Sequence, residues 1–501
     1  MKSLTALLLL NSVLWLSASA QTVPEKREQF HSYLLIGGKH MAEPVAAAAP
    51  TTTIERCFLL TDKGWEPALS GPDNAIGTAG GSFWNGPAKA FAKDLLAGDP
   101  QVSVGLIIAT QPEVNSENWG VKSEAFRKAR KLAKIAQKQS TIQGILWHGG
   151  EVLDPWQTEI DHLKTLIAYL RTDLRGLNLP VVIGTDPASA SLKAQLAALV
   201  QDVHATALAS PDPKRADASP YAAPMRTLIQ QWPLTHPKPT IPIIDAHIHA
   251  MAGKPGGLEP VIAWMERNGI ERALTSPIND AHGKTEDERR VMFENFAKYR
   301  GRIERFCLIE PGEVATVEEA VRILEKEKAA GAVAFGEHYG VGLMFDDPKN
   351  LLLYEACGKV GLPVMFHIDA SKNMDEKGLK RVERVLTLHP SCKLIAHARW
   401  WHHLPDGTCA RLMEKYPNLY ADISGPDMVS ILNRDRGQTR DLMTRFSDRI
   451  LFGSDAGWWS FNTQAEDREL HFELLEHFGL PEEIKKKIYR DNAIKLFGLK
   501  P

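Results

Sequence analysis

Cysteine is scarce in this chain, and the few cysteines present do not form a disulfide framework. The five residues occur singly and are odd in number, whereas a small secreted domain held by disulfides has a dense, even set. We therefore expect Cys57, Cys307, Cys357, Cys392 and Cys409 to be mostly buried, small hydrophobic residues. Stability must then come from burial of apolar surface, and 501 residues are enough for two domains with a core each.

A large excess of charge of either sign is also absent. Lys and Arg number 59 and Asp and Glu number 61, which gives a formal charge of -2 at pH 7. A nucleic-acid surface or a polybasic membrane patch normally appears as a clustered excess of basic residues. The composition therefore favours small or neutral partners over nucleic acid, and it leaves the oligomeric state open.

The only long apolar run lies at the N-terminus, and it is too short to span a membrane. Lys2 precedes an apolar stretch at residues 4–16, and the small residues Ala18-Ser19-Ala20 follow it. This order is typical of a signal peptide over residues 1–20, with a buried N-terminal helix as the alternative. We therefore expect export to the periplasm or the cell exterior, and no stable membrane span.

One segment near the middle of the chain cannot form a helix or a central strand. Residues 232–240 contain Pro233, Pro237 and Pro239, and prolines so closely spaced interrupt both kinds of element. We predict a linker here. It separates an N-terminal α/β domain over residues 21–231 from a C-terminal α/β domain over residues 241–501.

Short β-rich runs alternate with helical patterns throughout the C-terminal half. We expect strands at residues 241–250, 273–277, 303–310, 332–337, 363–368, 393–398, 419–423 and 450–455. Apolar residues recur every three or four positions in the intervening segments 258–268, 317–330, 379–388 and 468–478, which predicts helices. About eight strands alternating with helices predict a closed (β/α)₈ TIM barrel.

Side chains that can bind a metal follow the apolar part of several predicted strands. They are His247 and His249 at the first strand, Glu337 at the fourth, His367 at the fifth, His397 at the sixth and Asp455 at the eighth. Each histidine taken alone is more often a hydrogen-bonded core residue. The carboxyl ends of barrel strands meet at one mouth, however, and imidazole with carboxylate is a donor set for a divalent ion.

The order of these residues resembles a known family. Asp245-Ala246-His247-Ile248-His249, then Gly336-Glu337-His338, His367, His397 and Gly453-Ser454-Asp455 are similar to the motifs of the amidohydrolase superfamily, in its amidohydrolase-related (amidohydrolase 2) branch. The resemblance implies that His247, His249 and His367 bind the metal, that Asp455 completes the site and that His397 flanks it. Glu337 would bridge towards a second ion where one is bound. Zinc is the first expectation, and manganese and iron also accept these ligands, as one ion or two.

Such a site activates water for attack on a carbonyl group. Asp455 is the expected proton acceptor and later proton donor, while His397 helps to stabilise the developing oxyanion. Arg399 is expected to bind an anionic group of the substrate, with an ion pair elsewhere as the alternative. Trp400 and Trp458 are expected at the mouth, against the apolar face of a sugar or an aromatic acid, or packed on the N-terminal domain.

The N-terminal half resembles the sialate O-acetylesterase-like, SGNH-type carbohydrate esterases, which implies an α/β/α sandwich of flavodoxin-like kind. The resemblance is carried by Gly37-Gly38-Lys39-His40-Met41 and by Trp147-His148-Gly149-Gly150-Glu151. Lys39 stands where the family has its nucleophilic serine, Gly149 replaces a glutamine, and residues 212–224 lack the Asp-x-x-His pair. We therefore predict a degenerate esterase kept for binding or scaffolding, with Lys39 acting as a nucleophile as the alternative.

Three functions fit these patterns. The first is metal-dependent hydrolysis of an ester, lactone or amide of a small molecule, carbohydrate-derived by analogy with the neighbouring domain. The second is a metal-dependent decarboxylase of the same branch, and the third is a pseudoenzyme that binds glycans. Carbon dioxide release and metal content distinguish the three.

Overall fold

The computed structural model describes residues 21–45, 52–71, 74–79, 83–112, 114, 116–149, 156–185, 190–211, 215, 217–277, 285–462 and 468–501. The expected signal peptide at residues 1–20 lies outside these ranges. None of the helices within them has both the length and the apolar character needed to cross a bilayer. All five cysteines are buried and free, as expected.

The chain forms two compact units. The first contains residues 1–154, 180–188 and 207–230, and the second contains residues 155–179, 189–206 and 231–501. Two segments of the N-terminal half, residues 155–179 and 189–206, thus belong to the second unit. Residues 233–240, within the segment we predicted to be a linker, contain no helix or strand.

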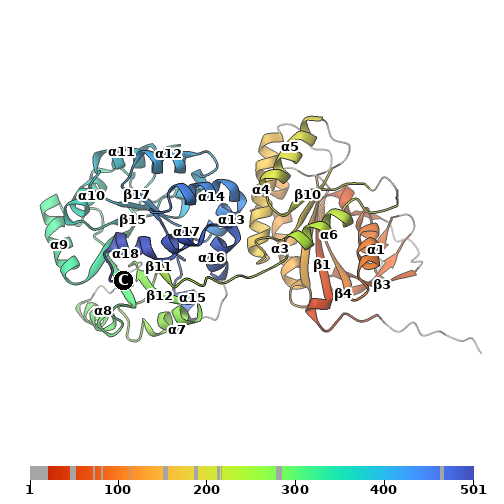
Figure 1. The fold of residues 1–501 in the computed structure, drawn as a ribbon, viewed down its shortest axis with the longest axis horizontal. Coiled ribbons are helices and arrows are strands. Elements are labelled where there is room, and N and C mark those ends of the chain that lie inside the picture. Colours follow the sequence, from red (N-terminus) through yellow and green to blue (C-terminus); the bar gives the residue numbers. More distant parts are fainter. Residues whose placement is uncertain are drawn as a thin grey trace, which may run out of the picture. The chain divides into compact units, whose positions relative to one another are not determined.

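A ten-stranded sheet organises the N-terminal half, with strand order β10-β9-β8-β1-β7-β3-β4-β5-β6-β2 (Figure 1). Its strands are β1 (Phe30–Gly38), β2 (Glu43–Val45), β3 (Thr52–Thr61), β4 (Gly64–Ser70), β5 (Ile76–Gly77), β6 (Phe83–Asn85), β7 (Ser103–Gln111), β8 (Thr141–His148), β9 (Val181–Gly184) and β10 (Thr206–Leu208). Parallel ladders join β9, β8, β1, β7 and β3, and antiparallel ladders add the remaining strands beyond β3. The sheet is therefore mixed around a parallel centre.

Helices α1 (Ala88–Gly98) and α3 (Glu124–Ala136) lie on either side of this sheet in Figure 1. Strand β1 is buried along almost its whole length, as expected for a strand covered on both faces. The other helical elements of this half are η1 (Arg27–Gln29), η2 (Lys39–Met41), α2 (Ser116–Trp119), α4 (Trp156–Asp173), α5 (Ala190–Asp202) and α6 (Ala222–Gln231). The predicted α/β/α sandwich is confirmed.

The second unit contains an eight-stranded barrel in which neighbouring strands pair in parallel, in sequence order from β11 to β18. The strands are β11 (Ile243–Ile248), β12 (Ile270–Thr275), β13 (Ile303–Cys307), β14 (Ala332–His338), β15 (Val364–Phe366), β16 (Leu394–Ala396), β17 (Leu419–Asp422) and β18 (Ile450–Leu451). A bridge between Ile248 and Ala456 connects the last strand to the first. All eight predicted strands are present, so the TIM barrel is confirmed.

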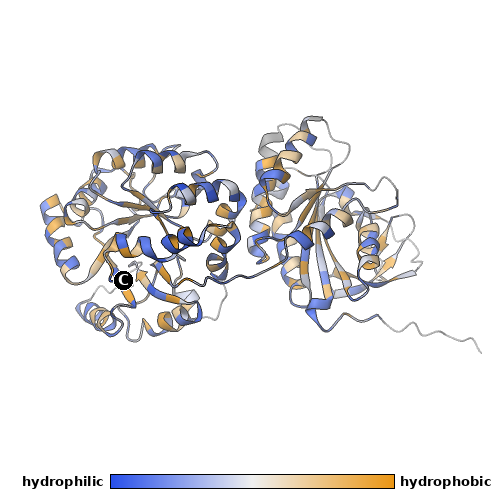
Figure 2. Cartoon of the chain, viewed as in Figure 1, coloured by the Kyte–Doolittle hydropathy of each residue, from blue (hydrophilic) through white to orange (hydrophobic). Residues whose placement is uncertain are grey.

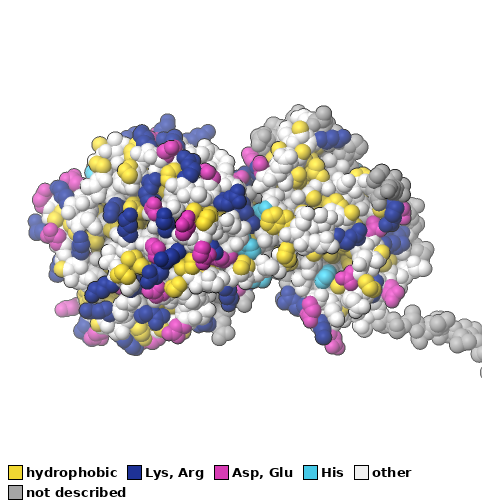
Figure 3. Space-filling model, in the orientation of Figure 1, with side chains coloured by type: hydrophobic (Ala, Val, Ile, Leu, Met, Phe, Trp, Pro, Cys, Tyr) yellow, Lys and Arg dark blue, Asp and Glu magenta, His cyan; other side chains and the backbone are white. Residues whose placement is uncertain are grey.

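Helices surround the barrel and carry hydrophilic residues alongside hydrophobic ones, as Figure 2 shows. They are α7 (Glu259–Arg267), α8 (Glu286–Lys298), α9 (Val317–Ala329), α10 (Pro348–Val360), α11 (Lys380–Leu388), η3 (Ala398–His403), α12 (Thr408–Lys415), α13 (Met428–Arg434), α14 (Arg436–Arg445), α15 (Trp458–Asn462), α16 (Glu469–Leu474), η4 (Leu475–Phe478), α17 (Glu482–Lys486), η5 (Lys487–Asp491) and α18 (Asn492–Phe497). Helix α8 begins with a capping box between Thr285 and Glu288, which satisfies two backbone N–H groups. Basic and acidic side chains are interspersed over the face shown in Figure 3, in keeping with the balanced charge.

The barrel has an inner core distinct from the layer between strands and helices. Alternate strand residues, among them Ile244, Phe306 and Met365, form a buried cluster with Leu496 and Phe497, the last two residues of α18. The apolar residues on the outer strand faces pack against the surrounding helices. Because the inner core fills the barrel, the space left for polar chemistry lies beyond it, at the carboxyl ends of the strands.

Two strands shift register where they reach that end. The β11 ladder is irregular between Asp245 and Ile248, and the β14 ladder is irregular between Phe335 and His338. Such irregularities redirect side chains next to functional sites. Gly336 has a φ of 119°, and a Cβ atom there would lie 2.3 Å from the Met365 carbonyl oxygen. Only glycine fits at this position, which is the residue directly before Glu337.

Candidate metal centre

The structure brings the five predicted ligands together with His397, which was expected to flank them, at the carboxyl ends of the barrel strands. Three groups have ligand atoms within 4.8 Å of one another, namely His247–His249–Glu337, His247–His397–Asp455 and Glu337–His367–His397. The groups overlap, so the six residues form one cluster. It draws on β11, on β14 and on the residues that follow β15, β16 and β18.

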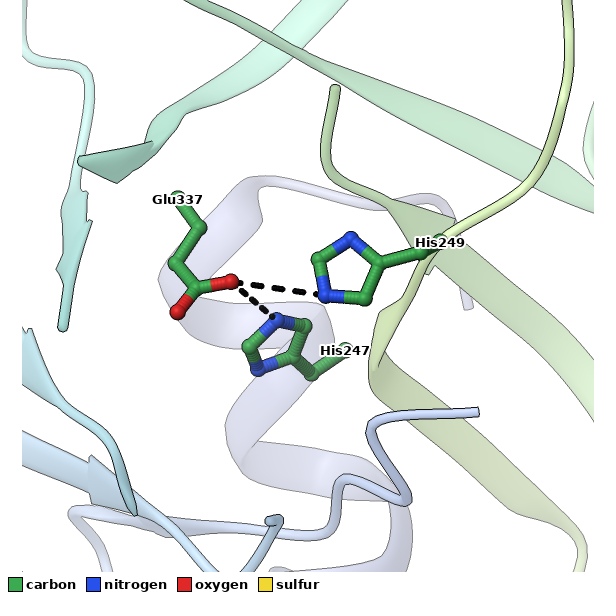
Figure 4. A group of neighbouring side chains, drawn as sticks. All are labelled: His247, His249 and Glu337. Atoms are coloured by element: carbon green, nitrogen blue, oxygen red, sulfur yellow. Dashed lines mark ion pairs between the residues drawn. The ribbon is translucent and has the colours of Figure 1, made fainter. Parts of the chain in front are cut away.

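Glu337 lies at the centre of this cluster (Figure 4). Its Oε2 atom is 3.3 Å from Nε2 of His247 and 3.4 Å from Nε2 of His249. Its Oε1 atom is 2.8 Å from Nδ1 of His367 and 3.6 Å from Nε2 of His397. One carboxylate therefore faces a ring nitrogen of each of the four histidines.

Access to solvent is uneven across the cluster. The side chains of His247, Glu337 and His397 are 0%, 1% and 2% exposed. Those of His249 and Asp455 are 10% and 18% exposed, and His249 Nε2 lies 3.1 Å from Asp455 Oδ1. His249 and Asp455 therefore border the side from which a substrate can approach.

Polar residues that the sequence reasoning did not single out surround the cluster. Asp422, the last residue of β17, lies 2.9 Å from Nδ1 of His247 and 3.1 Å from Nδ1 of His397. Asp369 lies 3.1 Å from Nε2 of His367, and Tyr339 donates a 3.0 Å hydrogen bond to Glu337. Asp422 ends an apolar strand just as the predicted ligands do, so the same signal was present in the sequence.

Charge in the cluster is balanced between carboxylates and imidazoles. Burial alone would raise the pKa of Glu337, but the nearby His397 and hydrogen bonds with the other histidines hold it well below its usual value. Burial would lower the pKa of His249, yet its contacts with Asp455 and Glu337 raise it to about 9. Burial is likewise outweighed at Asp455, where His249 and its neighbours lower the pKa to about 2. Asp455 is thus ionised at neutral pH.

The donor set fits a divalent cation. Imidazole nitrogen and carboxylate oxygen bind zinc, manganese and iron. The buried Nε2 atom of His247 has no hydrogen-bond partner among the described residues, although it faces the Glu337 carboxylate. A buried polar atom left without a partner is costly, and a cation between this nitrogen and the carboxylate would satisfy both groups.

The two tryptophans predicted to contact a substrate differ in their exposure to solvent. Trp458 is 62% exposed, directly after the loop that carries Asp455. Trp400 is 0% exposed and packs edge-on against Trp401 within the barrel core, so it offers no surface to a substrate, contrary to expectation. Its position after a strand did not reveal that η3 turns the side chain inward.

Arg399 is exposed and lies outside the three ligand groups. Two residues after His397, the side chain of Arg399 would lie on the same face as His397 if the strand continued. Strand β16 ends at Ala396, however, and Ala398 has a left-handed backbone with a φ of 52°. The period of two therefore does not extend to Arg399.

His338, which follows Glu337 in the sequence, is not part of the cluster. Its Nε2 atom lies 3.0 Å from Oδ1 of Asn350, at the start of α10. Burial lowers the pKa of His338 to about 4, so the ring is neutral at physiological pH. It is a hydrogen-bonded core histidine.

In the first unit, Lys39 begins η2 directly after β1 and is exposed. A Cβ atom on Gly37 would lie 2.2 Å from the His148 carbonyl oxygen, so the ends of β1 and β8 are in close contact. Nδ1 of His148 lies 2.6 Å from the Tyr221 hydroxyl. Gly150 and Glu151 of the esterase-like block lie outside the described residues. An exposed lysine lacks the desolvation that would activate it as a nucleophile.

Comparison with known families matches both halves of the chain. The amidohydrolase family model matches residues 244–499. The model of the carbohydrate esterases described as sialic acid-specific acetylesterases matches residues 37–211. No curated protein matches the sequence.

Several solved structures are similar to the barrel half. One is a putative 2-pyrone-4,6-dicarboxylic acid hydrolase from Pseudomonas putida, with 16% identity over 52% of this chain and 100% of that chain and a TM-score of 0.41. Another is an amidohydrolase from Burkholderia multivorans with bound zinc, with 16% identity over 52% and 100% of the two chains and a TM-score of 0.37. A third is 5-carboxyvanillate decarboxylase from Novosphingobium aromaticivorans with manganese, with 13% identity over 52% and 97% and a TM-score of 0.35.

Proposed function

Because this chain belongs to the amidohydrolase family, we propose that its barrel is a metal-dependent hydrolase that adds water to an ester, lactone or amide carbonyl of a small molecule. The observation that carries the proposal is a cluster of six residues in three overlapping groups, each with its ligand atoms within 4.8 Å of one another: His247, His249, Glu337, His367, His397 and Asp455. A carbohydrate-derived lactone is the first candidate substrate, since the other half of the chain matches a carbohydrate esterase family.

The ion would be held by His247, His249, His367 and Asp455, with Glu337 between them and Nε2 of His397 as a further nitrogen ligand. When bound, it polarises the carbonyl group and lowers the pKa of water, so that hydroxide is available near neutral pH. The identity of the ion and the choice between one ion and two are left to elemental analysis.

Asp455 and His397 carry the proton and charge movements of this proposal. Asp455 is ionised at neutral pH and partly exposed, so its carboxylate can take a proton from the attacking water. The same proton then passes to the leaving oxygen or nitrogen as that atom departs from the carbonyl carbon. Through the ion that it would help to hold, the ring of His397, near Glu337, would contribute to stabilising the negative charge that develops on the carbonyl oxygen.

The proposal is tested by assaying metal-stripped and reconstituted protein on a panel of lactones, esters and amides that includes sugar lactones. We expect acid release that depends on added metal and is lost in His247→Ala. Release of carbon dioxide would instead identify a decarboxylase. A protein that binds no metal and turns over no member of the panel would be a pseudoenzyme, and binding to a glycan panel would then be measured.

We also propose that the N-terminal half is an inactive esterase and that the chain is exported. The exposed Lys39 in the nucleophile position supports the first statement, and the apolar N-terminus supports the second. Mass spectrometry of the protein expressed with its N-terminus intact would show a mature chain that begins after Ala20. A chain that retains residues 1–20 would contradict export by a cleaved signal.

A further inference from the structure

The carboxylate of Asp422 is buried against two of the proposed ligands at once. The residue is fully buried at the end of β17. Its Oδ2 atom lies 2.9 Å from Nδ1 of His247, and its Oδ1 atom lies 3.1 Å from Nδ1 of His397. These histidines come from β11 and from the end of β16, which are not neighbours in the barrel.

We propose that Asp422 is a positioning residue that fixes the tautomer and orientation of His247 and His397 together, and so sets two ligand nitrogens of the metal centre. This inference rests on the proposed metal-dependent function. It concerns a residue that does not touch the ion, because both histidine rings lie between Asp422 and Glu337.

An ionised carboxylate such as that of Asp422 accepts hydrogen bonds and donates none. Each Asp422 oxygen faces the Nδ1 atom of one histidine. Both rings can therefore donate a hydrogen bond to the carboxylate when they carry their proton on Nδ1. Ser424 supports this arrangement, because its hydroxyl donates a 2.8 Å hydrogen bond to Oδ2 and its backbone N–H lies 3.2 Å from Oδ1. The oxygen of this hydroxyl also lies 3.1 Å from Nδ1 of His247 and 2.8 Å from Nδ1 of His397, where it can accept from the same Nδ1–H groups. The neighbours of this carboxylate can all act as donors.

The opposite ring nitrogens are then the ones without a proton. Nε2 of His247 and Nε2 of His397 both point towards Glu337, at 3.3 Å and 3.6 Å from its oxygens. A neutral imidazole binds a cation through its unprotonated nitrogen, and the hydrogen bond of the other nitrogen decides which one that is. Asp422 thereby turns both lone pairs towards the metal centre.

Gly453 leaves room for this arrangement. A Cβ atom at Gly453 would lie 3.3 Å from Oδ2 of Asp422, 3.2 Å from Cβ of His247 and 3.0 Å from Cβ of Ser424. A side chain there would therefore press on the carboxylate, on the ring that it orients and on the serine that supports it. The space next to Asp422 is available only because residue 453 has no side chain.

The substitution Asp422→Asn changes one oxygen into an amide nitrogen of nearly the same size. That nitrogen is a donor, so the histidine facing it must move its proton to Nε2 or turn away. In either case one ligand nitrogen is lost, and loss of such an orienting partner reduces metal affinity about 10- to 100-fold. Asp406→Asn is the matched control, because Asp406 accepts a hydrogen bond from the Thr408 backbone N–H and contacts none of the histidines of the cluster among the described residues.

The test is a titration of metal-stripped full-length protein with Co²⁺, whose visible absorption reports coordination without any assay of activity. We expect Asp422→Asn to bind Co²⁺ about 10- to 100-fold more weakly than wild type with an altered spectrum, whereas Asp406→Asn should bind Co²⁺ like wild type. Ser424→Ala, which keeps the carboxylate, should lose less affinity than Asp422→Asn. Wild-type affinity and spectrum in Asp422→Asn would overturn the positioning role, and so would an equal loss in Asp406→Asn.

A second measurement needs no variant and therefore does not depend on whether Asp422→Asn folds. In zinc-loaded wild-type protein with ¹⁵N-labelled histidine, we expect His247 and His397 to carry a proton on Nδ1 and to bind through Nε2. Binding of either ring through Nδ1 would overturn the inference. Wild-type protein that takes up neither cobalt nor zinc would overturn the proposed function itself, which separates the two failures.

Discussion

Nε2 of His249 and Oδ1 of Asp455 lie 3.1 Å apart, although His249 follows the first strand of the barrel and Asp455 follows the last. Their contact closes the cluster on the side that solvent reaches. We expect Asp455→Asn to reduce kcat by about 10²- to 10⁴-fold, because the amide cannot accept the proton of the attacking water. Because Asp455 is also a proposed ligand, kcat is compared per bound metal ion, with the metal content of both proteins measured by elemental analysis. Full turnover in this variant would mean that another group acts as the base.

Removal of the metal is expected to lower both activity and stability. A chelator should abolish turnover, and zinc or manganese should restore it. A ligand that binds only the folded state at 100 times its Kd adds about 2.7 kcal/mol to the free energy of unfolding. Thermal melts with and without metal measure this effect, and His247→Ala provides the control in which added metal should shift Tm little. Equal melting curves for stripped and loaded wild type would contradict the prediction.

Trp458 and Trp400 should behave in opposite ways when replaced by alanine. Trp458 is exposed near the centre, so its loss should raise KM about five- to tenfold for substrates with an apolar face and leave Tm unchanged. Trp400 is fully buried, so its loss should cost about 3–5 kcal/mol of folding stability. Steady-state kinetics and urea unfolding of both variants check the pair. A stable Trp400→Ala protein with altered KM would show that our assignment is reversed.

His471 is expected to make stability depend on pH. Its Nε2 atom lies 3.1 Å from the Gly425 carbonyl oxygen, and burial together with the positive Arg468 lowers the pKa of His471 to about 4. The unfolded chain takes up the proton below about pH 6.5, so the contribution is complete above that pH and is lost as pH falls towards 4. At pH 5 the loss is about 2 kcal/mol. In His471→Gln, the decrease in unfolding free energy between pH 7 and pH 5 should be smaller by that amount.

Lys39→Ala should leave hydrolysis by the protein unchanged. The side chain is exposed in the N-terminal unit, and it lies outside the metal-ligand clusters formed by the described residues. Activity towards acetyl esters and lactones, measured before and after the substitution, tests this. A loss of acetylesterase activity, or a covalent adduct trapped on Lys39 by borohydride, would show that this half is catalytic after all.

Most of the barrel and of its metal centre could be predicted from local sequence. Each strand is an apolar run, and a polar residue directly after such a run, as at His367 and His397, stands out because its burial requires a partner. The ladder shifts in β11 and β14 did not disturb the prediction, because they move the site residues along with their strands.

What could not be predicted depends on contacts between segments distant in the sequence. Asp422 carries the same strand-end signal, but only the fold shows that it lies behind two histidines. Asp369 lies in a loop, where no periodicity indicates which way a side chain points. The burial of Trp400 depends on how η3 turns after β16, and that turn has no clear signal in sequence.

The closure of the barrel has a consequence for the order in which the protein folds. Strand β18 has only two residues, and the ring is completed by hydrogen bonds from Ala246 to Phe452, from His249 to Ala456 and from Asp455 to His247. The backbone that closes the ring thus belongs to the residues that build the centre. A chain in which this segment has not yet docked holds its histidines without Asp455, so the ligand cluster is complete only once the ring has closed.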